Sequence, residues 1–277
     1  NRRTQENWDR FYFSNRQTEG KIEPVPFLRD PELETRLSQQ IGGRPVHAFR
    51  QVGSTMDAAH QLAAEGAPEG TLVVAMRQEQ GRGRLGRAWA SPEGGAYLSL
   101  ILRPTRPSGE VPQLSLVAGL SAAEAIRDAA CLYPSIRWPN DLLIRDNKIG
   151  GILTEARNGA VVVGIGINVS TDPAHLPEGS TSLAAEGASR VSREELIAGL
   201  CRRFDAWYDV WTHQGFAPVR EALRPWMGLF GHPVHLAAGA DRFEGTAADL
   251  DEAGRLLVRL DSGLMRQFEM GEVTRLR

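Results

Sequence analysis

A short glycine–arginine segment, Gly81–Arg87 (GRGRLGR), is the part of the sequence best suited to bind an anion. Its glycines at 81, 83 and 86 leave backbone N–H groups free to converge on negatively charged oxygens. The interleaved arginines add planar donor groups that match carboxylate or phosphate oxygens. Because these cations repel one another, we expect the loop to be mobile until an anionic ligand binds. A solvated basic turn is the alternative, but glycine–arginine alternation is poor turn design.

The same segment matches the dinucleotide fingerprint G-x-G-x-x-G over residues 81–86. That fingerprint needs a strand before it and a helix that opens within it. A strand is predicted at 71–76, but Pro92 and the pair Gly94-Gly95 exclude the helix. The sequence also lacks the P-loop pattern G-x-x-x-x-G-K-[ST]. Both common nucleotide-binding motifs are therefore excluded.

A second candidate segment is Arg137–Leu143 (RWPNDLL). Pro139 predicts a rigid bend, so Asn140 and Asp141 should be presented at a strand end, where sites in α/β sheets gather. Lys148 follows a turn at the start of the next apolar strand, and its compact cation suits a carboxylate or an α-phosphate. Taken alone, a lysine after a turn is usually just a solvated charge.

Two further motifs are weaker by themselves. Gly164–Asn168 (GIGIN) leaves one face of a buried strand without side chains, which permits close approach of a flat ligand. Tight packing against a neighbouring strand or helix explains this pattern equally well. Ser54-Thr55 stands at a predicted helix start, where a simple N-cap accounts for the pair.

The composition is typical of an ordinary soluble globular protein large enough for two domains. The 277 residues are 42% hydrophobic and 24% charged, with a net charge of −2. There is neither the domain-scale basic excess of a nucleic-acid binder nor an apolar run of about 18 residues that would span a membrane. Two distant cysteines, Cys131 and Cys201, are expected to be partly buried thiols in a reducing cytoplasm. His232 and His235 lack further metal ligands nearby.

The elements that must position these motifs alternate in type along the chain. We expect an extended arm over residues 1–25 and a helix from Pro31 to Gly42-Gly43, with Asp30 as its N-cap. A winged helix does not fit within residues 1–45. Strands are predicted at 46–52, 71–76, 96–102, 149–156 and 161–169. Helices are predicted at 57–65, 113–130 and 192–213, and the aromatic residues of the last are more typical of core packing than of a cofactor site.

After Pro225 the pattern changes to short strands separated by turn residues. These strands are predicted at 233–236, 241–250, 255–260 and 266–270, with a hairpin loop at 251–254. The pattern is typical of a small all-β barrel of about 50 residues, too small for independent chemistry.

Together, the four motifs and their order resemble the biotin–protein ligases. The resemblance rests on Ser54-Thr55, on Gln78 with GRGRLGR, on RWPNDLL with Lys148 and the following Gly150-Gly151, and on GIGIN. It covers about residues 27–277, including Gly271-Glu272-Val273 near the C-terminus. It is closest to the type of ligase that lacks an N-terminal DNA-binding domain.

The resemblance implies an α+β fold. A mixed β-sheet flanked by helices, as in class II tRNA synthetases and in biotin and lipoate ligases, would precede a small C-terminal SH3-like β-barrel. The implied organisation is an N-terminal arm and short helix (1–45), a biotin- and ATP-binding catalytic domain (46–226) and the barrel (227–277).

The resemblance also implies a reaction in two steps. ATP, with Mg²⁺, would activate biotin as biotinyl-5′-AMP, and a lysine of the biotin carboxyl carrier domain of acetyl-CoA carboxylase would then receive the biotin. No DNA or membrane partner is expected, and pairing of strand edges into a homodimer is left open.

Positions that match the family's motifs carry the implied site. Arg84, Asp141 and Lys148 would be catalytic, and Asp141 would either orient the incoming lysine amine or accept its proton; the alternative is that it merely caps a turn. Trp89 would fold over the adenine. Biotin contacts are expected from Ser54, Thr55, Met56, Gln78, Gly81, Arg82, Gly83, Arg84, Lys148, Gly151 and Gly164. ATP contacts are expected from Arg82, Arg84, Arg87, Trp89, Asn140, Lys148, Gly166 and Asn168, and no protein-held metal is expected.

Three positions depart from the family pattern. Met56 stands where the family usually has Asn, so one polar contact to the biotin head is in doubt. Arg137 replaces the commoner Lys, which keeps the charge but changes its reach. Leu85 stands where a further arginine is frequent, which leaves the loop less basic.

Three other functions compete with a biotin ligase. A lipoate–protein ligase shares the fold and the adenylation step, but Gln78 with Ser54-Thr55 favours a polar ureido head over a dithiolane. A biotin-dependent DNA-binding repressor would need a winged helix. A non-catalytic biotin-binding module would not need Lys148 or Asp141.

Overall fold

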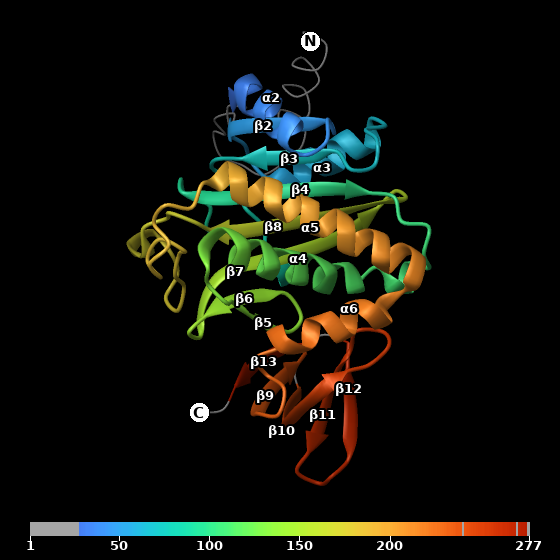
Figure 1. Ribbon diagram of the computed structural model, residues 1–277. Coiled ribbons are helices and arrows are strands. Elements are labelled where there is room, and N and C mark those ends of the chain that lie inside the picture. The colour runs from blue at the N-terminus through green and yellow to red at the C-terminus, as the bar shows by residue number, and fades with distance from the viewer. Residues whose placement is uncertain (1–27, 240, 270, 276–277) are drawn as a thin grey trace, which may run out of the picture.

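The computed structural model describes residues 28–239, 241–269 and 271–275. The arm expected over residues 1–25 lies outside these described residues. Within them, the chain forms a large mixed β-sheet covered by helices and a smaller antiparallel β-sheet near the C-terminus (Figure 1). The predicted α+β class is confirmed.

The large sheet has eight strands in the order β1-β2-β3-β4-β8-β7-β6-β5. β2 and β3 are parallel, whereas the other neighbouring pairs are antiparallel. The predicted strands are present, but the pattern does not predict β1, β5 or β6, which are too short to show a periodicity. The bounds are β1 (Leu28–Arg29), β2 (Val46–Gln51), β3 (Leu72–Ala75), β4 (Gly95–Leu102), β5 (Ser135–Arg137), β6 (Asp141–Ile144), β7 (Asn147–Arg157) and β8 (Ala160–Asn168).

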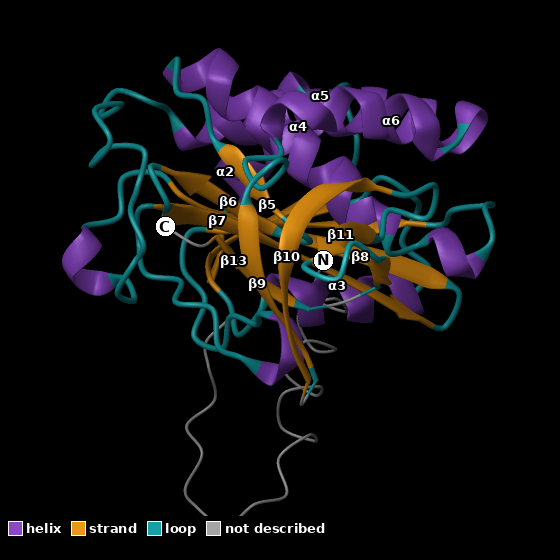
Figure 2. Ribbon diagram, turned by 90° about the horizontal axis from the view of Figure 1, so that it is seen from below, coloured by secondary structure: helices purple, strands orange, loops and turns teal. Residues whose placement is uncertain are grey.

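Helices cover both faces of this sheet, as Figure 2 shows from below. Strand side chains alternate between faces, so Val74 belongs to the core beneath one helix layer and its neighbour Val73 to the core beneath the other. A strand buried on both faces is continuously apolar, and every residue of β4 is buried. The layer formed by α4 (Gln113–Ala130), α5 (Arg193–Gln214) and α6 (Phe216–Leu223) lies opposite α3 (Thr55–Ala64).

The first described helix, α2 (Pro31–Gln40), begins at Pro31 as its sequence predicts and ends at Gln40, two residues before the predicted Gly42-Gly43. The Asp30 side chain accepts a hydrogen bond from the Leu33 N–H at 3.1 Å, which confirms the N-cap. Leu33 and Leu37 are buried in the larger core, so α2 packs against the same sheet as the helices after it.

The aromatic residues of α5 pack in the core, as predicted. Phe204 and Trp211 are fully buried, and Trp211 Nε1 donates to Gln113 Oε1 on α4 at 2.7 Å. Gly215, with φ +82, ends α5 and begins α6, a helix that the sequence pattern does not predict. The one-turn 3₁₀ helices are Arg84–Gly86, Ser108–Glu110, Pro173–His175 and Arg224–Trp226.

The C-terminal domain is a five-stranded antiparallel sheet in the order β12-β11-β10-β9-β13. The predicted hairpin loop is present, because Asp251 Oδ1 accepts from the N–H groups of Ala253 and Arg255. Trp138 Nε1 donates to Gly254 O at 3.0 Å, so this loop contacts the larger domain. The strands are β9 (Pro233–Ala238), β10 (Asp241–Leu250), β11 (Leu256–Leu260), β12 (Met265–Phe268) and β13 (Glu272–Arg275), of which β13 is not predicted.

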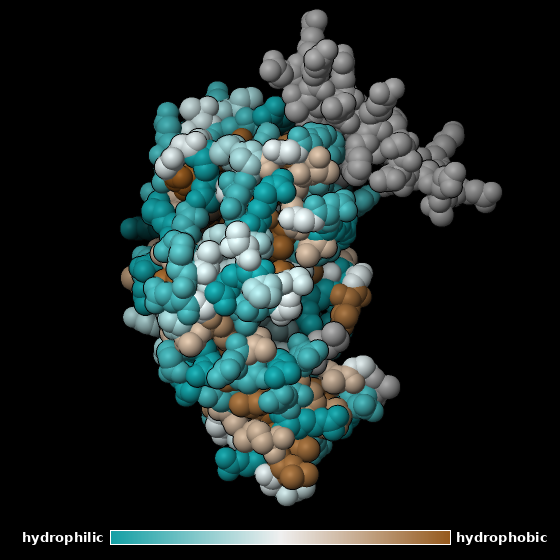
Figure 3. All heavy atoms as spheres, turned by 90° about the vertical axis from the view of Figure 1, so that its right-hand side faces the viewer, coloured by the Kyte–Doolittle hydropathy of each residue, from teal (hydrophilic) through white to brown (hydrophobic). Residues whose placement is uncertain are grey.

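Hydrophilic residues cover most of the face drawn in Figure 3, and apolar residues gather at its lower end, over the C-terminal domain. Leu264 and Met265, beside the turn between β11 and β12, are among the exposed large apolar residues.

The expectation of two partly buried thiols is wrong in detail: Cys201 on α5 is fully buried, whereas Cys131 follows the end of α4 and is exposed. No helix of the described chain has the length and apolar character of a membrane span.

Candidate active site

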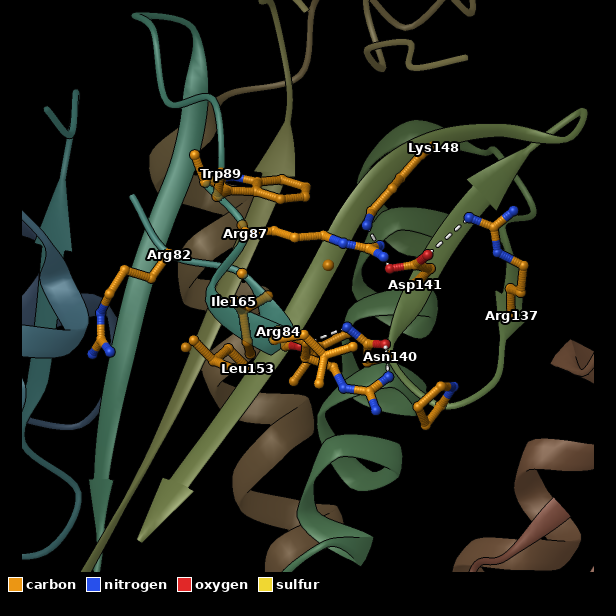
Figure 4. Close-up of a pocket in the computed structure, with 18 of the residues that line it drawn as sticks. Arg82, Arg84, Arg87, Trp89, Arg137, Asn140, Asp141, Lys148, Leu153 and Ile165 are labelled. Carbon is orange, nitrogen blue, oxygen red and sulfur yellow. Dashed lines mark hydrogen bonds and ion pairs between the residues drawn. The ribbon is translucent and has the colours of Figure 1, made fainter. Parts of the chain in front are cut away.

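One cavity of about 250 Å³ collects the motifs that the sequence singled out (Figure 4). Its walls come from the start of α3, the glycine–arginine loop, the turn between β5 and β6, and the middle of β7 and β8. The residues 271–274 of the C-terminal domain close another side. Both domains therefore contribute to the same site.

The glycine–arginine loop is a small closed hairpin. Gly83 N–H donates to Arg87 O at 2.8 Å and Trp89 N–H donates to Gly81 O at 2.9 Å. The expectation that the backbone N–H groups of this loop are free for an anion is therefore wrong for Gly83. Apart from the one-turn 3₁₀ segment, the described chain forms no helix between this loop and β4, so the loop does not open the helix that a dinucleotide fingerprint needs. The expected mobility of the loop stays a prediction.

The three loop arginines contact three different parts of the molecule. Arg82 binds the carboxylates of Asp57 and Glu155. Arg84 instead donates to the neutral amide oxygen of Asn140 at 3.0 Å. Arg87 forms an ion pair with Glu272 on β13. The loop is thus attached to α3, β7, the β5–β6 turn and the C-terminal domain.

Arg84 is the loop cation best placed to bind a ligand anion. Burial lowers the pKa of its guanidinium below the ordinary value, although nearby Asp141 and Glu272 act in the opposite direction. Within the described chain its hydrogen-bond partner is an amide and not a carboxylate. A half-buried cation without a carboxylate at contact distance gains from an incoming anion.

Asp141 joins two more cations at the opposite wall of the cavity. Its Oδ1 lies 2.6 Å from Lys148 Nζ and its Oδ2 accepts from Arg137 NH2 at 2.8 Å. The predicted positions are confirmed, because Asp141 begins β6 and Lys148 lies next to the start of β7. Trp138, before the cis peptide to Pro139, is buried and anchors the turn.

Two paired glycines form a flat floor beneath Trp89. Gly151 on β7 lies opposite Gly166 on β8. A Cβ atom on Gly166 would lie 2.6 Å from Trp89 Nε1, so the indole occupies the space that a side chain would need. Trp89 Nε1 is buried without a hydrogen-bond partner among the described residues, and Lys148 Nζ lies 5.2 Å from the ring centroid. A buried donor of this kind gains from an acceptor on a ligand.

The other end of the cavity is polar but uncharged. Gln78 Oε1 accepts from the Thr55 backbone N–H at 2.8 Å and from Thr55 Oγ1 at 3.0 Å. Ser99 Oγ donates to Thr55 Oγ1 at 2.9 Å, behind this pair. Ser54 occupies the N-cap position of α3, but its side chain makes no cap bond and its buried Oγ has no partner in the described part of the chain.

Met56 covers Gly164 at this uncharged end. Its Sδ lies 2.5 Å from the position of a Cβ atom on Gly164, and the side chain is buried. Apolar surface thus stands where a polar residue is usual in the family that the sequence resembles. Leu153, whose Cα pairs with that of Gly164, also lines the cavity.

Most of the sequence-predicted residues meet in this cavity, but some do not. Ser54, Gly81 and Asn168 are not among the residues that line it, and the Asn168 amide donates to Thr181 O at 3.0 Å. The predicted residues that line it are Thr55, Met56, Gln78, Arg82, Gly83, Arg84, Arg87, Trp89, Asn140, Asp141, Lys148, Gly151, Gly164 and Gly166.

The sequence reasoning missed the acidic partners of the loop and the hydroxyl group behind Thr55. Asp57, Glu155 and Glu272 each pair with a loop arginine, and Ser99 supports Thr55. One signal was present: Glu155 is a carboxylate within an otherwise apolar strand, IGGILTEA, where a charge needs a partner.

The arrangement is suited to an acid that has a neutral polar head and an anionic end. Thr55 and Gln78 offer groups to the head, while Arg84 and Lys148 offer cations to the carboxylate. A resident metal does not fit, because the described residues contain no group of three potential metal ligands and the cavity carboxylates of Asp141 and Glu272 are paired with cations. Any Mg²⁺ would have to arrive with the phosphates of a nucleotide.

Comparison with known proteins agrees with this geometry. Residues 48–172 match the model of the biotin/lipoate A/B protein ligase family, and residues 229–275 match that of the biotin protein ligase C terminal domain. The bifunctional ligase/repressor BirA of Bacillus subtilis is 35% identical over 251 residues, which are 87% of this chain and 77% of that protein. The biotin–acetyl-CoA-carboxylase ligase of Mycobacterium tuberculosis is 31% identical over 265 residues, 90% and 98% of the two chains.

Solved structures of biotin protein ligases are similar to most of this chain. The biotin protein ligase from Aquifex aeolicus in complex with biotin and ATP superposes with a TM-score of 0.74 at 31% identity, over 84% of this chain and 99% of that one. The biotin protein ligase from Leishmania major in complex with biotinyl-5-AMP has a TM-score of 0.57 at 29% identity, over 82% and 99%.

Proposed function

The chain belongs to the biotin protein ligase family, and from this premise we propose that it activates biotin with ATP and transfers it to a lysine of an acceptor protein. One observation carries the proposal: a single cavity joins the uncharged pair Thr55 and Gln78 to the cations Arg84 and Lys148. Biotin has a neutral ureido head and a carboxylate at the end of an aliphatic tail, so it matches both ends.

The floor of β8 sets the direction of the bound acid. Gly164 lies at the uncharged end under Met56, and Gly166 lies under Trp89 near Lys148. Residues two apart on a strand share a face and are separated by about 7 Å. The ureido head would therefore contact Thr55 and Gln78, while the aliphatic tail runs over the glycines towards the cations.

The first step joins two anions. A biotin carboxylate oxygen attacks the α-phosphorus of ATP, the bond to the bridging β-phosphate oxygen breaks, and pyrophosphate leaves biotinyl-5′-AMP in the site. Arg84 and Lys148 would offset the repulsion between the reactants and stabilise the charge that develops on the phosphate. To do so, Lys148 Nζ would exchange its 2.6 Å contact with Asp141 for the substrate.

The second step transfers the acyl group to an amine. The acceptor lysine attacks the acyl carbon of biotinyl-5′-AMP, the bond to the phosphate oxygen breaks, an amide forms, and AMP leaves with the loss of one amine proton. When Lys148 turns to the substrate, Asp141 Oδ2 still accepts from Arg137, and a carboxylate paired with an arginine is a weak base. We therefore assign Asp141 to orienting the amine rather than to accepting its proton.

Trp89 and the loop would enclose the intermediate. The indole already covers the glycine floor, and its buried Nε1 can donate to a ligand acceptor there. The relative solved with biotinyl-5-AMP supports an adenylate as the species that is held. Any Mg²⁺ would enter with ATP, and no step assigned to these residues depends on it.

Two assays test the proposed function. Mixed with biotin and ATP, the protein should release pyrophosphate and retain a species with the mass of biotinyl-5′-AMP. Addition of a biotin carboxyl carrier domain should then yield a biotinylated product, and its lysine-to-arginine variant should not react. Adenylation of lipoate but not of biotin would overturn the substrate assignment. Biotin binding without release of pyrophosphate would indicate a non-catalytic module.

The acceptor and the domain division belong to the same proposal. The M. tuberculosis relative is named for acetyl-CoA carboxylase, which supports the carrier domain of that enzyme as the acceptor. We divide the chain into residues 1–45, a catalytic domain at 46–226 and a C-terminal domain at 227–277. The absence of a DNA partner stays a prediction. Sequence-specific binding in a gel-shift experiment at low salt would contradict it.

Whether two chains form a homodimer also stays open, and light scattering would measure the mass of the protein in solution.

A further inference from the structure

A cluster of charged residues lies at the base of the glycine–arginine loop, outside the contacts assigned to substrate. It consists of Asp57 and His60 on α3, Arg82 in the loop, and Glu155 and Arg157 on β7. Glu155 is its centre, because its Oε2 contacts Arg82 NH2 at 3.1 Å, His60 Nε2 at 3.0 Å and Arg157 NH2 at 3.0 Å.

Arg82 uses its terminal nitrogens within this cluster. NH1 donates to Glu155 Oε1 at 2.9 Å, and NH2 contacts both Glu155 Oε2 and Asp57 Oδ1, the latter at 2.9 Å. Its Nε is buried. Figure 4 shows the guanidinium directed away from Arg84, Lys148 and Asn140. Although Arg82 belongs to the loop that lines the cavity, its charge is therefore already neutralised outside the anion site.

Partial burial makes the ion pair between Arg82 and Glu155 more stable than an ordinary surface pair. The side chains of Arg82 and Glu155 are 30% and 22% exposed, and His60 behind them is 8% exposed. Exposed single ion pairs contribute little, whereas bidentate arginine–carboxylate pairs in restricted geometry contribute more. Glu155 is further held by the strand β7, which carries Gly151 in the floor of the site.

The backbone transmits this contact to the residues that face the ligand. Arg82 forms a β-bridge with Ala88, and its neighbour Gly81 accepts from the Trp89 N–H. When Arg82 is held in place, both strands of the hairpin are held with it. The distance of Trp89 from Gly166 is then set as well. Arg84 and Arg87 are held less firmly, by an amide and by an exposed pair respectively.

We infer that Arg82 is a positioning residue, which Glu155 and Asp57 clamp so that the hairpin places Arg84 and Trp89 over the bound adenylate. The inference rests on the proposed function for its ligand. It assigns the arginines of one loop to different tasks: Arg82 anchors the hairpin, and Arg84 neutralises the substrate. It also gives Glu155, two residues beyond Leu153 in the cavity wall, a role in the reaction without substrate contact.

The experiment is a double-mutant cycle of Arg82→Gln and Glu155→Gln, read as the rate at which biotinyl-5′-AMP escapes from the enzyme. If Arg82 acts only through the clamp, each single change should raise escape on the order of tenfold, the factor for one lost charge-assisted hydrogen bond. The double variant should show the factor of Arg82→Gln alone and not the product of the two single factors, because Glu155 acts only through Arg82. Asp57→Asn, which keeps an acceptor oxygen but removes its negative charge, should have a smaller effect in the same direction.

A matched control is Glu194→Gln. It removes a similar two-point pair with Arg36, between α2 and α5 and away from the cavity, so it should leave escape unchanged. Thermal unfolding of every variant shows whether a loss is one of folding. If Arg82→Gln abolished pyrophosphate release while Glu155→Gln behaved like the parent, Arg82 would act on the substrate and the inference would be overturned.

A second readout needs no substrate. Trypsin should cut after Arg84, next to the exposed Leu85, faster in Glu155→Gln than in the parent or in Glu194→Gln. Equal cutting rates would show that Glu155 does not hold the hairpin and would overturn the inference. A parent that released no pyrophosphate with biotin and ATP would instead reject the proposed function, while the proteolysis would still decide whether the clamp exists.

Discussion

The indole of Trp89 lies directly against Gly166, at a place where no other residue type leaves it room. A Cβ atom on Gly166 would lie 2.6 Å from Trp89 Nε1, and one on Gly151 would lie 3.1 Å from its Cζ3. The two glycines are paired across β7 and β8. The position of the indole therefore depends on two glycines, because a side chain at either position would collide with the ring.

Gly166→Ala should impair the site much more than the fold. The added methyl group meets one edge of an indole in a half-buried loop, so the ring can shift at small cost in stability. Its shift should nevertheless weaken retention of the nucleotide, and we expect kcat/KM for ATP to fall on the order of tenfold or more. Gly109→Ala is the control, because no atom lies within 4 Å of its Cβ position. Equal kinetics of the two variants would contradict the contact.

Arg84→Ala should release the intermediate early. The guanidinium is half-buried and hydrogen-bonded to the Asn140 amide, so its removal costs the fold little, less than about 1 kcal/mol. The adenylate phosphate loses its main loop cation, and we expect biotinyl-5′-AMP to escape on the order of tenfold faster. Rapid filtration of the enzyme–adenylate complex measures this rate. Arg145→Ala, on an exposed turn, serves as control, and unchanged retention in Arg84→Ala would contradict the loop's role.

Asp141→Asn should separate the two steps of the reaction. The amide keeps the shape of Asp141 but removes the charge that holds Lys148 and Arg137. Freed Lys148 can still bind phosphate, so the pyrophosphate burst should largely remain, while transfer to the acceptor lysine falls on the order of tenfold or more. Single-turnover measurements of both steps make the comparison, with Asp146→Asn as control. A larger loss in the first step would argue that Asp141 serves adenylation.

The local sequence predicts the long strands and the helices other than α6, and the longest of these have a clear repeating apolar pattern. The helix expected at 113–130 is observed as α4, and the strand expected at 161–169 is observed as β8 with ends one residue away. The C-terminal β13 is not predicted because a four-residue strand at a sheet edge, with a single buried residue, has no such pattern.

The candidate site is only partly predictable for a different reason. The motifs identify Arg84, Asp141 and Lys148 as chemical groups, but not their neighbours in space. That Gly151 lies opposite Gly166 follows from the register of β7 and β8, and the pairing of Arg82 with Glu155 follows from residues far apart in the chain. Spacing in one segment shows which groups are available, whereas tertiary packing decides which of them are already neutralised.

One thiol per chain should react in the native protein. Cys131 is exposed after α4, whereas Cys201 is fully buried and burial raises its pKa to about 12. Because the thiolate is the reactive form, Cys201 should be inert until the protein unfolds. Titration with a chromogenic disulfide should detect one thiol in buffer and two in denaturant, and Cys131→Ser should abolish the native reaction. Rapid native modification of that variant would show that α5 opens.

Stability should fall as the pH drops through the ordinary histidine range. Burial lowers the pKa of His47, aided by Arg29 and opposed by Glu34 and Glu65; it also lowers that of His60, aided by Arg157 and Arg82 and opposed by Glu155. The unfolded chain takes up protons near pH 6.5 while the folded chain resists them, so the free energy of unfolding decreases below that pH.

The expected loss between pH 7.5 and about 5.5 is on the order of 1 kcal/mol per histidine. The titration of Glu155 lies outside this pH range. Its pKa lies below the ordinary 4.5 because Arg82, His60 and Arg157 together outweigh burial, so its contribution is present above that value and disappears only as the pH falls further. Denaturant unfolding across the window should therefore show a flatter profile for His47→Gln with His60→Gln than for the parent. A double variant that retained the full slope would place the proton uptake in other groups.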